Sequence, residues 1–174
     1  MISAFSNVVR SCTHHTQALR HIRPLITVDA AKTIAFSIVG ARLDYCNSLL
    51  FGTAACNLDR LLCVQNTLAS AVLQKPFSAH SIELRRELHW LPFRQRIEYK
   101  IVVITYKAKD SGLPVYLHDL LDDYQPTRTL RSSTANKLQC PPLISSFADR
   151  SFAIAASTVW NSLSPSTRSA DTIG

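Results

Sequence analysis

The chain has 174 residues, 47% hydrophobic and 18% charged, a composition that excludes an intrinsically disordered chain. The 19 Lys and Arg against 12 Asp and Glu give a formal net charge of +7, which favours polyanionic partners, with an ordinary solvated basic surface as the alternative. Glycines number four, and the glycine-rich motifs of dinucleotide-binding, P-loop and hydrolase-elbow enzymes do not occur.

The first predicted helix covers residues 5–22, where apolar residues recur on one face at helical spacing. His15 falls on this apolar face, which favours a partly buried, hydrogen-bonded histidine over a metal ligand. Cys12 and His14 lie close to it, but a second ligand pair at a suitable spacing is missing. The opposite, solvent-facing side carries Arg10, His14, Gln17 and His21.

Two more helices are predicted to complete a bundle. Pro24 ends the first helix, and Thr27 is placed to cap the second by accepting a backbone N–H bond. An apolar stripe predicts that the second helix continues, with a bend at Gly40, through Tyr45 and Leu49. A third helix follows over residues 57–73. Three amphipathic helices with short connections indicate a three-helix bundle.

A second helical region is expected to follow the bundle. A short helix is predicted over residues 81–88, with His89 and Trp90 as packing residues at the junction that follows. The strongest periodicity predicts a helix from Pro92 to Lys109, because apolar residues recur at helical spacing along it. They are Phe93, Ile97, Ile101, Ile104 and Ala108.

The remainder of the chain is predicted to alternate short helices with extended segments. A short helix over residues 115–121 precedes a loop-rich segment at about 122–146, in which 138–140 form a short strand. Ser146 is placed to cap a last helix that ends near Ser162. The predicted fold is therefore mainly α, with one domain over residues 1–75 and a second over 76–174.

The helix after Pro92 carries a basic strip of Arg96, Lys100 and Lys107, bordered by Tyr99, Val103 and Tyr106. Basic side chains beside tyrosines suit a phosphate backbone and stacked bases. The alternative is that both apolar stripes are buried and the aliphatic stems of the basic residues lie between them. The sequence leaves both interpretations open for this strip.

The positive charge is concentrated in the first part of the chain. Residues 1–109 carry 14 basic and 6 acidic side chains, a net +8, whereas residues 110–174 carry 5 and 6, a net −1. A basic contact surface therefore belongs to the first part.

Enzymatic and metal chemistry find little support in the sequence. Asp122 and Asp123 form the one carboxylate doublet, which we interpret as a solvated helix end because no flanking hairpin or third carboxylate accompanies it. Five cysteines without a C-x-x-C pair predict neither a disulfide framework nor a zinc site. The N-terminus lacks a signal peptide, and the longest uncharged run contains seven Ser and Thr. We expect an intracellular protein, nuclear or cytoplasmic, without metal, cofactor, small-molecule substrate or membrane contact.

Several strings occur together and in order. They are ARLDYCNSLL at 41–50, VQN at 64–66, ELHWLP at 87–92, RQRI at 94–97, TYKA at 105–108, LRSS at 130–133 and WNSL at 160–163. Together they resemble the C-terminal third of the reverse transcriptases of jockey-like non-LTR (LINE-type) retrotransposons. The resemblance covers nearly the whole chain. It implies a polymerase thumb, a helical bundle that grips the template–primer duplex, followed by the region after the thumb.

The resemblance also implies what this chain does not contain. The catalytic aspartates and the endonuclease of such polymerases lie upstream of the matching region, so no catalysis is expected from this chain. The expected function is contact with RNA or an RNA–DNA duplex through the basic residues Arg10, Arg20, Arg23, Arg94, Arg96, Lys100 and Lys107. The alternative is a degenerate relic or helical interaction module without nucleic-acid binding. Ser70 and Pro142, which stand where the family often has arginine, favour that alternative.

Overall fold

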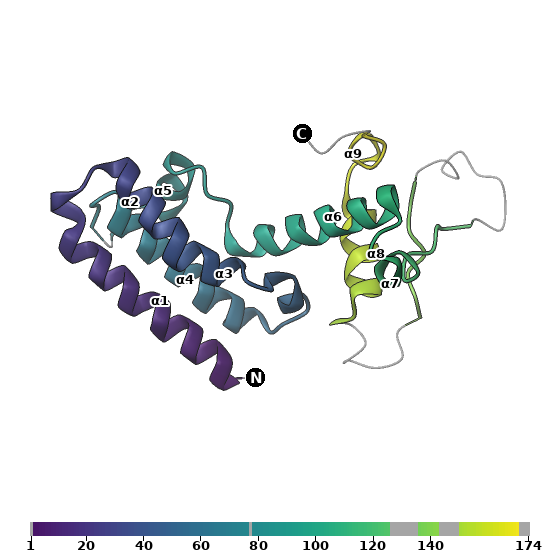
Figure 1. Ribbon diagram of the computed structural model, residues 1–174, viewed down its shortest axis with the longest axis horizontal. Helices are drawn as coiled ribbons and strands as arrows, with labels where there is room; N and C mark the ends of the chain where they lie inside the picture. The colour runs from purple at the N-terminus through teal and green to yellow at the C-terminus, as the bar shows by residue number, and fades with distance from the viewer. Residues whose placement is uncertain (1, 77, 126–135, 143–149, 171–174) are drawn as a thin grey trace. The chain divides into compact units, whose positions relative to one another are not determined.

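The computed structural model describes residues 2–76, 78–125, 136–142 and 150–170 (Figure 1). The described part is mainly helical, which confirms the predicted fold class, and its β pairing is a single isolated bridge between Asp123 and Leu138. The chain divides into two compact units, residues 1–47 with 53–96 and residues 48–52 with 97–174. The first unit therefore extends past residue 75, the boundary expected from the sequence, to include a further short helix.

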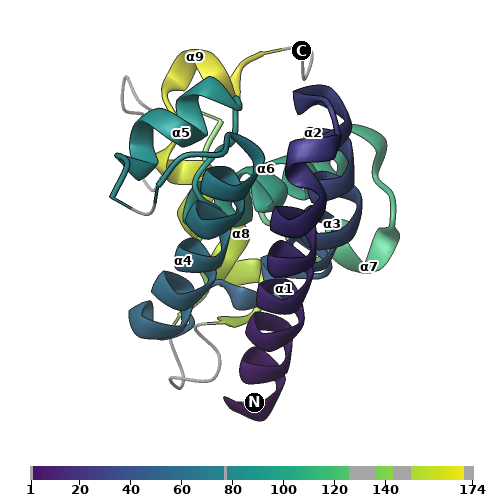
Figure 2. The ribbon, with the colours of Figure 1, turned by 90° about the vertical axis from the view of Figure 1, so that its left-hand side faces the viewer.

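The first unit is built on helices α1, α2, α3, α4 and α5, joined by short 3-10 and π-helical stretches. Their bounds are α1 Ile2–Ile22, α2 Val28–Ala35, α3 Ala41–Asp44, α4 Ala55–Val72 and α5 Ser81–Glu87. Figure 2 shows α1 lying between α4 and α3. α1 and α4 run in the same direction, since the Val9 end of α1 lies at the Cys56 end of α4 and Arg20 lies at Ser70.

The core of the first unit is apolar and comes from all three long segments. Its buried side chains include Phe5, Cys12 and Leu19 of α1, Ala31, Ala35 and Val39 of the α2 region, and Leu61, Leu68 and Val72 of α4. Burial of each of the larger side chains contributes roughly 1.5–3 kcal/mol to the free energy of folding. This shared core is therefore what holds the bundle together. The Thr27 cap is confirmed, because its hydroxyl accepts the Ala30 N–H bond at 3.2 Å.

The second predicted helix is interrupted where the sequence indicated a bend. A π-helical stretch, Phe36–Gly40, separates α2 from α3, and the extra residue turns Ile38 outward so that it is 40% exposed. A Cβ on Gly40 would lie 3.2 Å from Cδ2 of Phe36, closer than an ordinary contact, so a larger residue here would have to displace the exposed Phe36 ring by a few tenths of an ångström. The predicted continuation to Leu49 is wrong, because α3 ends at Asp44 and Cys46 adopts a positive φ of 51°.

Two helix ends in the first unit are closed by left-handed residues that are not glycine. After α5, the N–H of His89 donates to the Arg86 carbonyl at 3.1 Å, and the N–H of Trp90 donates to the Arg85 carbonyl at 2.8 Å. This is a Schellman motif with His89 at φ 56°, and Gln74 ends α4 in the same way at φ 53°. The prediction that His89 packs at the junction is wrong, since it is exposed.

His89→Gly should therefore stabilise the first unit by about 0.5–1 kcal/mol, because a side chain in the left-handed region is strained and glycine is not. Urea denaturation measures the change in the free energy of unfolding. Glu87→Gly, at the exposed last residue of α5, is the matched control and should destabilise by a similar amount. Destabilisation by both substitutions would contradict the assignment of His89 as the helix cap.

The described part of the second unit contains the longer part of α6 and three short helices. Their bounds are α6 Phe93–Ser111, α7 Val115–His118, α8 Phe152–Ser162 and α9 Pro165–Arg168. The long helix expected from Pro92 is confirmed with its start shifted by one residue. Its buried residues are Phe93, Ile97, Ile101, Thr105 and Ala108, while Ile104 is half-buried. The helix expected over 115–121 ends at His118, and Ser146 lies outside the described residues.

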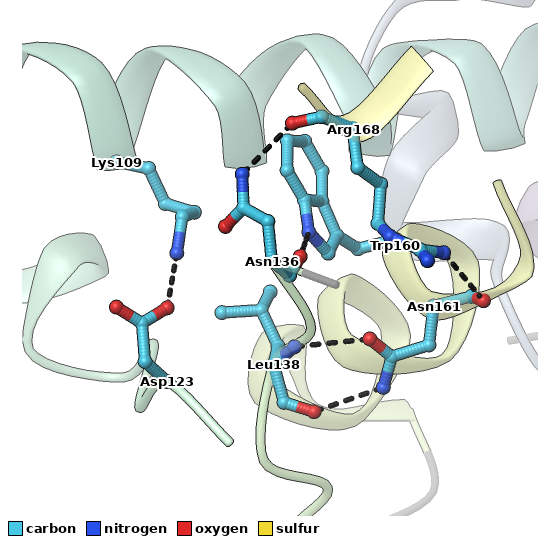
Figure 3. A network of polar contacts seen from close by, with 7 residues as sticks. All are labelled: Lys109, Asp123, Asn136, Leu138, Trp160, Asn161 and Arg168. Atoms are coloured by element: carbon cyan, nitrogen blue, oxygen red, sulfur yellow. Dashed lines mark hydrogen bonds and ion pairs between the residues drawn. The ribbon is translucent and has the colours of Figure 1, made fainter. Parts of the chain in front are cut away.

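A polar network holds the extended residues 136–140 of the second unit in place (Figure 3). The N–H of Leu138 donates to Oδ1 of Asn161 at 2.9 Å, and Nδ2 of Asn161 donates to the Leu138 carbonyl oxygen at 2.9 Å. The carboxamide of Asn161 therefore pairs with Leu138 as a neighbouring strand would. On the other side, the N–H of Tyr124 donates to the Lys137 carbonyl at 3.0 Å.

The same network anchors α9, which the sequence did not predict. Nε1 of Trp160 donates to the Asn136 carbonyl at 2.8 Å, and Nδ2 of Asn136 donates to the Arg168 carbonyl at 2.8 Å. Arg168 is 4% exposed, and its Nη1 donates to the Asn161 carbonyl at 3.1 Å. Trp160 and Asn161 thus join the extended residues 136–140 to the consecutive helices α8 and α9.

Candidate nucleic-acid interface

The seven predicted contact residues lie in very different environments. Arg23 is 6% exposed, and its guanidinium donates from Nε to the Val72 carbonyl at 2.6 Å and from Nη1 to the Ile26 carbonyl at 2.8 Å. Val72 is the last residue of α4, whose terminal carbonyls have no partner within the helix. A cation there is also favoured by the helix dipole. Arg23 is therefore a structural residue, and we remove it from the contact surface.

Two arginines at the start of α6 form ion pairs within the first unit. Arg94 pairs with Asp59 of α4 at 2.8 Å, with both side chains about half exposed. Arg96 pairs with Asp44 of α3, and these side chains are 17% and 31% exposed. Because an acidic partner already neutralises each guanidinium, neither adds a full positive charge to the surface.

The other cations of α6 are Lys100 and Lys107. Lys100 is half-buried and interacts with another group of the protein, whereas Lys107 is exposed. Tyr99 is 55% exposed, so the interpretation in which this tyrosine is a core residue is wrong. The basic strip expected on α6 therefore offers a nucleic acid less positive charge than the sequence indicated, because Arg96 is already ion-paired.

The remaining predicted residues, Arg10 and Arg20, belong to α1. Arg20 is half-buried, and its Nη2 donates to Oγ of Ser70 at 3.5 Å. Arg10 is exposed, and its side chain makes no ion pair within the described part of the chain. Arg10 is thus the predicted α1 cation that stands on the surface.

Arg10 belongs to a row of exposed polar side chains along α1. Asn7, Arg10, His14, Gln17 and His21 are all exposed, and their spacing of three and four residues places them within an arc of about 80°. The row covers 15 residues of α1, from Asn7 to His21, or roughly 21 Å along the helix. We call these five residues the α1 row. The sequence pattern already placed four of them on the solvent side, and Asn7 was missed because a lone Asn carries no signal.

The electrostatic surroundings of the α1 row are positive. α1 contains two Arg and three His and no Asp or Glu. The first unit carries 11 Lys and Arg against 5 Asp and Glu, a formal +6, whereas the second carries 8 against 7, a formal +1. Most of the positive charge therefore lies in the first unit, although less of it than in residues 1–109, because Lys100, Lys107 and Lys109 belong to the second unit.

Two titratable groups on α1, His15 and Cys12, have pKa values shifted by their surroundings. Partial burial, together with the charges of Arg42 and His14, lowers the pKa of His15, so this imidazole is neutral at pH 7. Burial raises the pKa of the Cys12 thiol, against the opposing effect of Arg42, and the thiol stays protonated. At neutral pH His15 therefore adds no positive charge to this surface, and Cys12 is not in its nucleophilic thiolate form.

A groove of about 510 Å³ lies beside the α1 row, between α1 and α4. The hydroxyls of Thr13, Thr16 and Thr67 all donate to carbonyls of their own helices, at 2.8, 2.8 and 2.9 Å. Because these hydroxyls bond their own helices, the threonines contribute mainly methyl groups to the groove. Together with Val9 and Val64, these methyl groups make the walls of the groove largely apolar. The lining also includes Asp59 and Arg60, so the groove carries a carboxylate that repels phosphate, and the polar α1 row, which has none, is the better candidate for a polyanion.

Four of the seven strings that carry the family resemblance contact one another in pairs within the first unit, whereas LRSS at 130–133 lies outside the described residues. Asp44 of the 41–50 string binds Arg96 of the 94–97 string, and it also accepts from Nδ2 of Asn47 at 3.2 Å. Gln65 is 1% exposed, and its Nε2 donates to the Leu91 carbonyl at 2.7 Å. These residues therefore hold α3, α4 and the start of α6 together, a structural role that the strings alone did not reveal.

Comparison with protein-family models, curated proteins and solved structures finds no match. Among the described residues, no group of three or more His, Cys, Asp and Glu is placed to hold a metal ion. Within the same residues, every helix is too short or too polar to cross a bilayer.

Proposed function

We propose that the chain contacts nucleic acid, RNA or an RNA–DNA duplex, through the outer face of α1 and performs no catalysis of its own. The observation that carries this proposal is the α1 row. Its side chains can all donate hydrogen bonds, and no carboxylate on α1 repels a phosphate. A polyanion is the partner that this combination suits best.

The composition of the row favours a duplex over a single strand. Proteins that bind single strands present exposed aromatic rings on which the bases stack. α1 has no Tyr or Trp, and its Phe5 is 7% exposed. Hydrogen-bond donors along a straight face instead suit phosphates and sugar hydroxyls, which a duplex presents on its outside.

The resemblance to jockey-like reverse transcriptases points in the same direction. In that interpretation the first unit corresponds to the polymerase thumb, which grips the template–primer duplex. The catalytic aspartates belong to a part of the polymerase that precedes this region. The role proposed for the chain is therefore binding, and the chemistry belongs to another part of such an enzyme.

A second candidate function is a helical interaction module that does not bind nucleic acid. This candidate is favoured because the guanidinium groups of Arg23, Arg94 and Arg96 already bind partners within the first unit. The salt dependence of binding separates the two candidates.

Binding of the chain to an RNA–DNA duplex should weaken steeply as salt is added. The slope of log K against log salt concentration should be negative, by about 0.9 for each phosphate that Arg10 or a neighbouring cation neutralises, because each neutralised phosphate releases a counterion. Fluorescence anisotropy of a labelled duplex measures this slope. A flat salt response, or no binding at low salt, would instead support the interaction module.

A further inference from the structure

Two exposed aromatic rings belong to the segment that runs from α2 through α3. Tyr45 is 81% exposed, and Phe36 is 58% exposed. Tyr45 directly follows α3, and the chain turns after it at Cys46, whose φ is 51°. Most of Tyr45 is therefore in contact with solvent, although the sequence predicted it inside a longer helix. Exposed rings of this kind are the surfaces on which proteins stack nucleic-acid bases.

Arg42 connects Tyr45 to the α1 row. Its Nη1 donates to Oγ of Ser11 at 2.7 Å, and Ser11 follows Arg10 directly and lies one helical turn before His14. Arg42 is itself exposed and precedes Tyr45 by three residues, about one helical turn. A guanidinium has five N–H donors, so the bond to Ser11 leaves Arg42 able to bind a phosphate as well.

The direction of the chain places Tyr45 at one end of the α1 row. The chain reverses over residues 23–27, so the α2–α3 segment runs back along α1, and Figure 2 shows α1 and α3 side by side. Because Arg42 bonds Ser11, Tyr45 lies farther toward the N-terminal end of α1, where the row begins with Asn7. A duplex that follows the row toward Asn7 therefore reaches Tyr45 where the row ends.

The carboxylates of the α2–α3 segment do not oppose a phosphate at Arg42. Asp44 is bound by Arg96. Asp29 lies in the first turn of α2, at the opposite end of the segment, and Nζ of Lys32 is 3.9 Å from its carboxylate. Within the described part of the chain Arg42 has no carboxylate partner, so its charge is available to a phosphate.

We propose that Tyr45 and Arg42 form a site for the single-stranded nucleotides that extend a bound duplex. The ring of Tyr45 stacks on the first unpaired base, and Arg42 binds the phosphate beside that base. This inference rests on the proposed function, because it takes the duplex to lie along the α1 row. It adds a preference for a duplex with a single-stranded overhang over a blunt duplex of the same paired length.

Anisotropy titrations of the full chain test this preference. They compare a blunt RNA–DNA duplex with the same duplex extended by a short overhang at either end of the RNA strand. The wild-type chain should bind one of the extended duplexes about tenfold more tightly than the blunt duplex, as expected for the stacking of one base. Tyr45→Ala should remove this advantage and leave the affinity for the blunt duplex unchanged. Tyr45→Phe, which keeps the ring, should retain it.

Two further measurements make the test specific to Tyr45 and Arg42. A 2-aminopurine at the first unpaired position should lose fluorescence on binding the wild-type chain, because stacking quenches it, and should not do so with Tyr45→Ala. Arg42→Gln should weaken binding of the extended duplex more than binding of the blunt duplex. Tyr99→Ala is the matched control, since Tyr99 is 55% exposed and precedes a lysine in α6, and it should leave the advantage intact.

Circular dichroism confirms that each variant is folded. Equal binding of blunt and extended duplexes by the wild-type chain overturns the inference and leaves the proposed function standing. An advantage that survives Tyr45→Ala, or that Tyr99→Ala removes instead, has the same consequence. A chain that does not bind the blunt duplex overturns the proposed function, and this inference falls with it.

Discussion

Asn161→Ala should lower the free energy of unfolding of the second unit by about 2–4 kcal/mol, because it leaves two buried backbone groups without partners. Leu138 is 2% exposed, and both its N–H and its carbonyl oxygen bond the Asn161 carboxamide at 2.9 Å (Figure 3). Water cannot replace these bonds without opening the structure. Urea denaturation followed by Trp160 fluorescence, in a Trp90→Phe background, measures the loss.

Two neighbouring substitutions serve as controls for Asn161→Ala. Ser162→Ala removes an exposed hydroxyl that bonds the Val159 carbonyl within its own helix, and it should change stability by less than about 0.5 kcal/mol. Asn161→Asp keeps the acceptor but sets a carboxylate oxygen against the Leu138 carbonyl oxygen, so at neutral pH it should destabilise at least as much as Asn161→Ala. An Asn161→Ala effect no larger than that of Ser162→Ala would contradict the role assigned to the network.

Arg23→Met should destabilise the first unit by roughly 1.5–3 kcal/mol, because it removes charge-assisted bonds to two carbonyls. The Met side chain retains most of the aliphatic bulk, so the change isolates the guanidinium bonds to Val72 and Ile26. Arg23→Lys keeps the charge without the planar fork and should be intermediate. Arg10→Met, at an exposed position of α1, should change stability by less than about 0.5 kcal/mol. Thermal and urea denaturation should agree on this order, and equal effects at the two arginines would contradict it.

The contrast between Arg10 and Arg23 shows where sequence reasoning ends. Helical periodicity predicted α1, α4 and α6 well, because a face that must be buried repeats at a fixed spacing. The cap at Thr27 was also predictable, since its partner lies three residues away. Arg23 bonds a carbonyl 49 residues away, and no local pattern records such a partner. The charge of an arginine is visible in a sequence, but its burial is a property of the assembled bundle.

The same limit applies to the irregular parts of the fold. The π-helical stretch at Phe36–Gly40 inserts one residue into an otherwise regular stripe, so Ile38 has the right spacing for the core but is exposed. Asn161 carries no periodic signal, since its role depends on the extended residues around Leu138. For the candidate site, the solvent side of α1 could be predicted from spacing. Its importance relative to α6 could not, because the ion pairs of Arg94 and Arg96 are tertiary contacts.

The most direct test of the proposed function compares the α1 row with other exposed cations of the same unit. The row variant carries Arg10→Gln, His14→Gln and His21→Gln, and the control variant carries Lys75→Gln and Arg86→Gln, which are also exposed. Anisotropy titrations with an RNA–DNA duplex at low salt should show roughly tenfold weaker binding for the row variant, as expected for the loss of one arginine–phosphate contact. The control variant should bind nearly as the wild type does. Equal binding by both variants, or a larger loss in the control, would contradict the assignment of the contact surface to α1.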